Sequence, residues 1–477
     1  MKKKKKVKSI SNKKNVKYYI IELTYLGQYE KELKNIEKEE IIPDTMFKLI
    51  IEESNLIEID QNITNKRVID EFNEYERTFR KNNEDINIII DVKEEDIDEN
   101  HYVSIFGKNI IINNGNDFVK ENKDKIKIFI NNEEKALKYK YKLKKGYHKI
   151  IIKLNSDEID NLAYMFSGCT SLKSIEGLKY LDTKNIKSFS FMFYGCSSLS
   201  DIKGLKSWNT SNCQDFSAMF YGCSSLSDIK GLQSWNVSNG NNFENMFSEC
   251  SSLSEIKELQ NWNVSNGKDF KGMFWGCLSL LDITGLESWN ISNGKYFEGM
   301  FWGCESLLDI KGLENWNVSN GINFSGIFRE CKSLSDIKSL EKWDVSNGNN
   351  FSQMFYKCES LSDINGLQNW NVSNGKDFSF FFFGCSLLSD IKPLENWNVS
   401  NGNNFEYMFY ICKSLSDIKG LQNWNVSNAN NFKGMLGGCT SLSDIEALEN
   451  WNVPNGIDFS NMFLAFDSSS DIKGLTN

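Results

Sequence analysis

From Met165 onward, apolar and polar positions recur in a pattern with a period of 27 residues and no gaps. In one copy, residues 226–230 place two apolar residues around polar ones and are followed by Gly231, which predicts a short strand and a bend. Residues 235–240 then supply turn formers, and Gly240 is free to adopt a positive φ. The spacing i, i+3, i+4 and i+7, typical of one helix face, follows in Phe243, Met246, Phe247 and Cys250.

Eleven of the twelve cysteines and ten of the twelve tryptophans keep this register. The cysteines are Cys169, Cys196, Cys223, Cys250, Cys277, Cys304, Cys331, Cys358, Cys385, Cys412 and Cys439, and the tryptophans are Trp208, Trp235, Trp262, Trp289, Trp316, Trp343, Trp370, Trp397, Trp424 and Trp451. Such repetition predicts units that bury their apolar side against neighbouring copies. We predict an α/β repeat solenoid over residues 156–477, with one short strand and one short helix in each of about twelve coils. At the usual strand spacing its length would be about 55–60 Å.

Residues 1–150 differ in kind, because they contain none of the cysteines or tryptophans. Residues 1–17 form a basic arm that we expect to be disordered, since like charges and no apolar period mark such tails. Residues 18–155 predict a small α+β domain. A helix is expected at 68–81, and strands are expected in the Ile- and Tyr-rich runs 18–26, 86–92, 102–112, 126–130 and 149–154.

The amino-acid composition mainly excludes classes of function. His101 and His148 are the only histidines, which leaves little material for imidazole catalysis or metal binding, so we expect no enzyme, no cofactor and no metal. No run reaches the roughly 20 apolar residues of a membrane span, and the polar residues after the 2–6 lysine run do not form a signal peptide. The formal charge is −9, with +3 in residues 1–150 (31 basic, 28 acidic) and −12 in residues 151–477 (24 basic, 36 acidic).

The repeats resemble a known family, the BspA-like leucine-rich repeats, a surface-protein repeat of about 26 residues. The resemblance rests on Met-Phe-x-Gly-Cys-x-Ser-Leu, as in residues 219–226, and on Trp-Asn-x-Ser-Asn, as in residues 235–239, and it covers residues 165–477. It implies a leucine-rich-repeat-like solenoid of a kind found on bacterial and protist surfaces and implicated in adhesion, without catalytic residues. One departure is Gly240, where the family is expected to carry an apolar residue that Val237 supplies earlier, so the turn is expected to be rebuilt.

The cysteine ladder lacks the paired spacing of a zinc site, so we interpret it as buried, reduced thiols that pack as small apolar groups. Reduced thiols are typical of the cytosol. Cys213 replaces the turn glycine of other copies, and an exposed, reactive thiol is the alternative there.

Acidic and basic residues form two further ladders, two residues apart on what we predict to be one strand surface. They favour a self-neutralising charge mesh, because lysines between carboxylates offset repulsion of roughly 1 kcal/mol per pair. Calcium binding is the alternative, but the glycine-rich pattern of calcium-binding rolls is missing. The acidic ladder is Asp201, Asp228, Glu255, Asp282, Asp309, Asp336, Asp363, Asp390, Asp417, Asp444 and Asp471, and the basic one is Lys203, Lys230, Lys257, Lys311, Lys338, Lys392, Lys419 and Lys473.

Asn-x-Ser triplets such as the one at Asn236 match the glycosylation pattern, but glycans stacked at coil spacing would collide. We therefore expect these asparagines to cap turns or to bond between coils.

A third candidate is an aromatic position that directly follows the Met-Phe pair, about 140° around the predicted helix from its core-facing Phe. Partly exposed aromatics there would either anchor a partner or cover the seams between coils, and both interpretations stay open. The residues are Tyr194, Tyr221, Trp275, Trp302, Tyr356, Phe383 and Tyr410. The irregular copies at 327–330 and 380–383 are further positions to mutate.

These observations predict a non-enzymatic protein-interaction scaffold in the cytoplasm. The alternative is a surface-exposed, BspA-like adhesin that binds host or extracellular ligands, and an enzyme in the N-terminal domain is the third class. The expected partner is a protein rather than nucleic acid. Near the C-terminus the ladder lapses at Phe466 and Ser469 with no polar capping helix. We expect the last coil to fray, to pair with another chain in an oligomer, or to be tolerated because its residues have turned polar, and these alternatives stay open.

Overall fold

The structure is a computed structural model that describes residues 6–11, 17–22, 85–92, 103–104, 106, 118–131, 133–143, 146–154, 158–173, 175–453 and 457–465. It divides the chain into two compact units, Met1–Lys81 and Asn82–Asn477. The helix expected at 68–81 lies outside the described residues.

The described residues of the first unit form an antiparallel strand pair, β1 (Lys6–Ser11) and β2 (Lys17–Glu22), with Lys6 opposite Glu22 and Ser11 opposite Lys17. This differs from the disordered arm expected over residues 1–17. The physical reason is the neighbouring segment, because β2 is rich in Tyr and Ile, which favour strands and offer the arm a backbone partner.

The second unit begins with a four-stranded antiparallel sheet of order β3-β8-β5-β6. Its strands are β3 (Asp85–Val92), β5 (Ile126–Ile130), β6 (Glu133–Lys135) and β8 (Gly146–Leu154). The strands predicted at 86–92, 126–130 and 149–154 are confirmed. Of the run 102–112, the described strand is β4 (Val103–Ser104), which pairs with β7 (Lys140–Tyr141), and a short helix, α4 (Phe118–Asn122), was not predicted.

The sheet and the coils share one hydrophobic core. Alternation along β5 buries Ile128, which lies in the same core as Ile152 of β8. The ring of Phe106 lies 6.0 Å from that of Phe118 and 6.2 Å from that of Phe166 in the first coil. Phe106, which follows β4, therefore covers an apolar side chain at the N-terminal end of the repeats, where repeat proteins need such cover.

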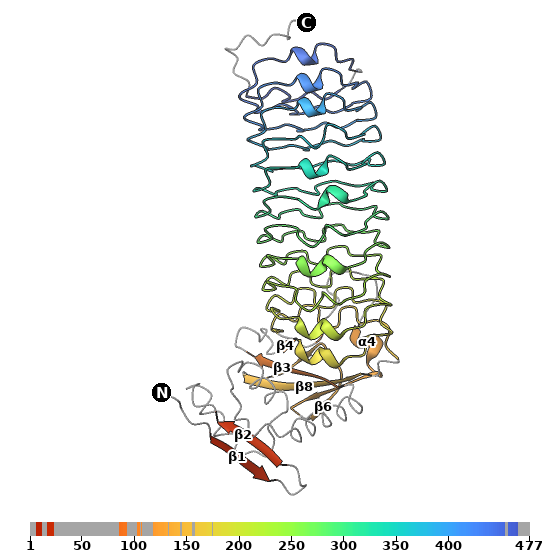
Figure 1. Cartoon of the computed structure of the whole chain (residues 1–477), viewed down its shortest axis with the longest axis vertical. Coiled ribbons are helices and arrows are strands. Elements are labelled where there is room, and N and C mark those ends of the chain that lie inside the picture. Colours follow the sequence, from red (N-terminus) through yellow and green to blue (C-terminus); the bar gives the residue numbers. More distant parts are fainter. Residues whose placement is uncertain are drawn as a thin grey trace. The chain divides into compact units, whose positions relative to one another are not determined.

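The coils stack one on another (Figure 1), and parallel backbone bridges join residues 27 positions apart, such as Asp215 and Asn242. Ring centroids of successive tryptophans, such as Trp235 and Trp262, lie 6.2 Å apart and nearly parallel. Inside this stack the phenylalanines also form columns, with 5.6 Å between Phe220 and Phe247. The tandem repeat predicted from the sequence is thus the organising feature of the second unit.

The secondary structure within a coil differs from the prediction. The segment expected to be a strand at 226–230 is not one, and the equivalent segments lead into a turn or a short 3₁₀ helix. These helices are η2 (Glu176–Tyr180), η3 (Lys203–Ser207), η4 (Lys257–Asn261), η5 (Leu313–Asn315), η6 (Lys338–Leu340), η7 (Lys392–Leu394), η8 (Lys419–Leu421) and η9 (Glu446–Leu448).

The short helix expected at 243–250 is a run of tight turns. Asn245 and Glu249 have positive φ values of 55° and 59°, which a right-handed helix does not allow. The backbone N–H groups alternate in direction: Met246 donates back to Phe243 O at 3.2 Å, and Phe247 donates to Met273 O of the next coil at 2.9 Å. With a left-handed residue at every fourth position, the N–H groups of every second residue from Phe243 to Glu249 donate to the next coil, so the segment builds the stack instead of a helix.

Candidate interaction surface

The tryptophan and cysteine ladders lie inside the stack. The indole Nε1–H of Trp235 donates to Leu205 O at 2.9 Å, and the thiol of Cys250 lies 3.2 Å from Phe220 O, each 30 residues back along the chain. The same two contacts recur from coil to coil. Both ladders therefore join neighbouring coils through groups that water does not reach.

The cysteines are all free and buried, as predicted for packed thiols. Burial raises the pKa of Cys196 to about 12, which leaves little thiolate at neutral pH. The alternative of an exposed thiol at Cys213 is wrong, because its side chain is buried and burial raises its pKa strongly. The register explains this: a Cβ placed on Gly240 would lie 2.6 Å from the ring of Phe243, so side chains at this position point into the core.

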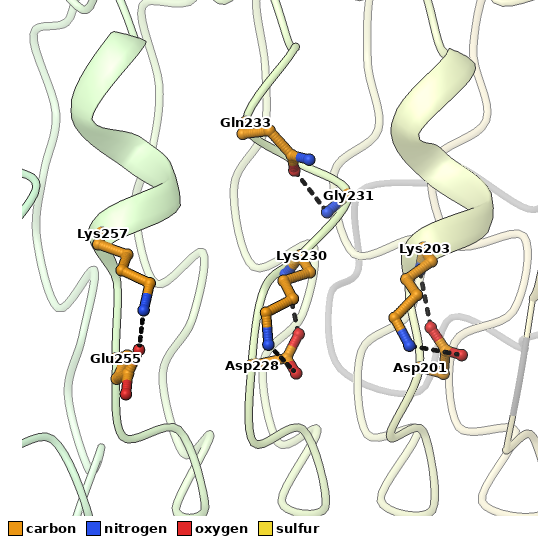
Figure 2. Close-up of polar contacts among 8 residues, drawn as sticks. All are labelled: Asp201, Lys203, Asp228, Lys230, Gly231, Gln233, Glu255 and Lys257. Carbon is orange, nitrogen blue, oxygen red and sulfur yellow. Dashed lines mark hydrogen bonds and ion pairs between the residues drawn. The ribbon is translucent and has the colours of Figure 1, made fainter. Parts of the chain in front are cut away.

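Figure 2 shows how the acidic and basic ladders meet. The carboxylate of Asp228 accepts the backbone N–H of Lys230 at 3.0 Å and pairs with its ammonium group at 3.3 Å. The pair of Glu255 and Lys257 lies at 2.6 Å. The pairs form within one coil, and the aspartates start the turn or 3₁₀ helix that follows by bonding to its backbone. Exposed pairs of this kind contribute little stability, so the ladder mainly fixes local backbone geometry.

Lysine side chains also join carboxylates of neighbouring coils. Within the described residues, no group of three or more His, Cys, Asp or Glu side chains is placed to hold a metal ion. Lys271 instead lies 3.9 Å from Glu244 and 3.7 Å from Glu298, so it bridges two carboxylates of neighbouring coils.

The Asn-x-Ser triplets behave as expected for turn and inter-coil residues. The side-chain oxygen of Asn236 accepts the backbone N–H of Ser238 at 3.1 Å, and the amide of Asn239 donates to Ser211 O of the previous coil at 2.6 Å. Asn236 therefore caps a turn within its coil, and Asn239 joins two coils.

The seven predicted aromatic site residues are all half-buried and lie in one register position. We call this position the outer column. Its rings stack face to face between neighbouring coils, with 4.7 Å between Tyr194 and Tyr221, 4.8 Å between Trp275 and Trp302, and 5.2 Å between Phe383 and Tyr410. The ring faces thus cover the seams between coils, while part of each ring remains accessible.

Arg329 occupies the same register in the irregular copy at 327–330. Its guanidinium lies 4.2 Å from the ring of Trp302 and 4.4 Å from that of Tyr356, so a planar cation continues the aromatic stack. It also donates a hydrogen bond to Gln353 and lies 3.6 Å from Glu330. Arg329 is the sole arginine in residues 151–477. Its position 27 residues after Trp302 indicates from the sequence that it takes the aromatic register.

A second aromatic column, which the sequence reasoning missed, flanks both ends of the first. Tyr164 stacks on Phe191 at 4.8 Å, and Tyr407 lies 5.0 Å from Tyr410 of the outer column. Glycines take this register in the middle coils, at Gly272, Gly299 and Gly326. The spacing of three residues from the outer column, seen again in Phe380 and Phe383, was the available clue.

The geometry defines a protein built from tandem 27-residue coils. In four overlapping spans, residues 122–228, 199–308, 281–389 and 362–474, the chain matches the family described as Mycoplasma protein of unknown function, DUF285. The spans together cover most of the sequence, so the chain belongs to this repeat family. No curated protein and no solved structure matches it. None of the helices in the described ranges is long and apolar enough to span a membrane.

Proposed function

We propose that the chain is a non-enzymatic scaffold of the BspA-like, leucine-rich-repeat-like kind, which binds a protein partner through the outer column. The observation that carries the proposal is the stack of half-buried aromatic side chains along the coils. Rings already held by their neighbours lose little conformational entropy on binding, and Tyr, Trp and Arg are the residue types that anchor protein interfaces.

The roles of the titratable groups in the repeats support a non-enzymatic function. The thiols are buried with raised pKa values, and the aspartates of the charge ladder accept backbone N–H groups. Groups that are committed to packing and turns in this way do not supply a nucleophile or a general base.

For the location of the protein, we propose a reducing intracellular compartment, supported by the free thiols. The second candidate is a surface-exposed adhesin for host or extracellular ligands, and it is favoured by the Met-Phe-x-Gly-Cys and Trp-Asn-x-Ser-Asn motifs. Labelling intact cells with a membrane-impermeant reagent separates the two. A protected protein with reduced cysteines supports the first, and outside labelling replaces it by the second.

The binding function is tested with a library of random peptides displayed on phage and selected on the purified full-length chain. Selected peptides are then assayed on Trp302→Ala and Phe383→Ala, with circular dichroism to check folding. We expect both variants to lose binding. If peptides selected on the native chain bind both folded variants with unchanged affinity, the outer column is structural and the proposal fails.

A further inference from the structure

Two consecutive coils depart from the repeat at solvent-facing positions. Leu281 and Leu308 occupy the register where other coils carry serine, as in Ser227 and Ser254, and Leu278 occupies another polar register. Their exposed fractions are 49%, 58% and 46%. Other coils stack with polar residues at these positions, so packing between coils does not require leucine there. We call Leu278, Leu281 and Leu308 the leucine patch.

The three leucines lie close together on neighbouring coils. The backbone N–H of Leu308 donates to Leu281 O at 3.1 Å, and Leu278 and Leu281 flank the buried Leu280 in one coil. The same two coils carry the stacked pair Trp275 and Trp302 of the outer column. Only Gly276 and the buried Cys277 separate Trp275 from Leu278. The leucine patch and the tryptophan pair of the outer column are therefore carried by the same two coils.

The charge around the leucine patch is acidic. Of the six carboxylates in residues 275–314, three pair with lysines: Glu298 with Lys271, Glu305 with Lys332 and Asp309 with Lys311. The remaining three, Asp282, Glu287 and Glu314, have no lysine partner among the described residues. Asp282 directly follows Leu281 and is exposed, and Thr284 stands where Lys311 stands in the next coil. Lys311 lies 3.0 Å from Asp309, whereas Asp282 has no lysine two residues later to pair with.

We propose that the leucine patch binds a basic amphipathic segment of a protein partner. The apolar side chains of that segment cover the leucines, and its lysines or arginines face Asp282 and the neighbouring carboxylates. This inference rests on the proposed binding function and names the partner chemistry. An anionic lipid surface would also offer apolar groups, but the acidic border repels it, so charge favours a cationic polypeptide.

The test uses the full-length chain and a synthetic helical peptide of about 18 residues made of Leu and Lys, with its Leu and Glu counterpart as the charge control. Binding is followed by fluorescence anisotropy of a dye on the peptide at low and physiological salt. Leu281→Ser/Leu308→Ser restores residues that other coils carry, so the variant is expected to fold. Leu387→Ser, which removes a leucine that is 53% exposed in another coil, is the matched control.

We expect the lysine peptide to bind, and the Leu281→Ser/Leu308→Ser variant to weaken its Kd by about tenfold while Leu387→Ser leaves it unchanged. Thr284→Lys is expected to weaken Kd about threefold at low salt and less at high salt. Equal binding of the glutamate peptide, or an unchanged Kd in the double leucine variant, overturns the inference.

Different results would refute the leucine patch inference and the proposed function of the outer column. If the lysine peptide does not bind while Trp302→Ala and Phe383→Ala still abolish capture of library-selected peptides, the leucine patch inference fails and the proposed function stands. If the leucine variants weaken the lysine peptide and the two aromatic variants change nothing, the outer column is structural and the leucine patch alone is the binding surface.

Discussion

Replacing Trp289 by Phe tests the ladder that joins the coils. The indole of Trp289 is 3% exposed, donates to Leu259 O at 3.0 Å, and lies 6.4 Å from the rings of both Trp262 and Trp316. Phenylalanine keeps an aromatic ring there but removes the N–H donor and part of the ring system.

The expected cost has two parts. Leu259 O still accepts the backbone N–H of Trp262 at 3.0 Å, so losing the indole bond costs only about 1 kcal/mol. The smaller ring buries roughly 40 Å² less apolar surface and leaves a gap, which costs about 1 kcal/mol more. We therefore expect Trp289→Phe to lower the free energy of unfolding by about 2 kcal/mol.

Trp451→Phe is the matched control, because Trp451 makes the same bond to Leu421 O at 3.0 Å but is only partly buried. Urea unfolding followed by circular dichroism measures both variants against the native chain. We expect the loss at Trp451 to be about half that at Trp289, since less surface is desolvated there. Equal losses at the two positions, or no loss at Trp289, would refute the reasoning that burial between coils gives the ladder its strength.

Three further predictions concern other parts of the second unit. Arg329→Met should lower stability by about 1 kcal/mol because it removes the contacts with Trp302 and Tyr356, and an unchanged melting temperature would contradict the stacked-cation role. A thiol reagent at pH 8 should modify none of the cysteines in residues 169–439 until the chain unfolds, and a fast-reacting thiol in the folded protein would contradict their burial. Burial and the charge of Asp269 raise the pKa of Glu244, so its ionisation costs stability above that pKa. Glu244→Gln should therefore raise the melting temperature at pH 7 more than at pH 4, and equal shifts at both values would rule this out.

The period of the repeat, and with it the burial of the cysteines, could be predicted because stacking in register forces each residue type to meet its counterpart. The helix predicted in each coil was wrong, since apolar residues at i, i+3, i+4 and i+7 also suit a run of turns that points one side inward. Glycines within that segment, such as Gly272 and Gly276 on either side of Met273 and Phe274, were the missed evidence for positive φ.

The charge ladder was predicted as a mesh, and the structure adds what spacing alone does not reveal. An aspartate two residues before a backbone N–H can accept it, so Asp201 and Asp228 set the following turn as well as pairing with lysine. The outer column was found from the sequence by its register. The stacking of its rings, and the position of Arg329 between Trp302 and Tyr356, follow from the distance between neighbouring coils, which the sequence does not give.

The most direct test of the scaffold function is hydrogen–deuterium exchange of the full-length chain with and without a saturating library-selected peptide. We expect slower exchange at the turns that carry the outer column, around Trp275, Trp302 and Phe383, and no change at the charge ladder around Asp201 and Asp228. Protection confined to the charge ladder, or none in the repeats, would contradict the scaffold function.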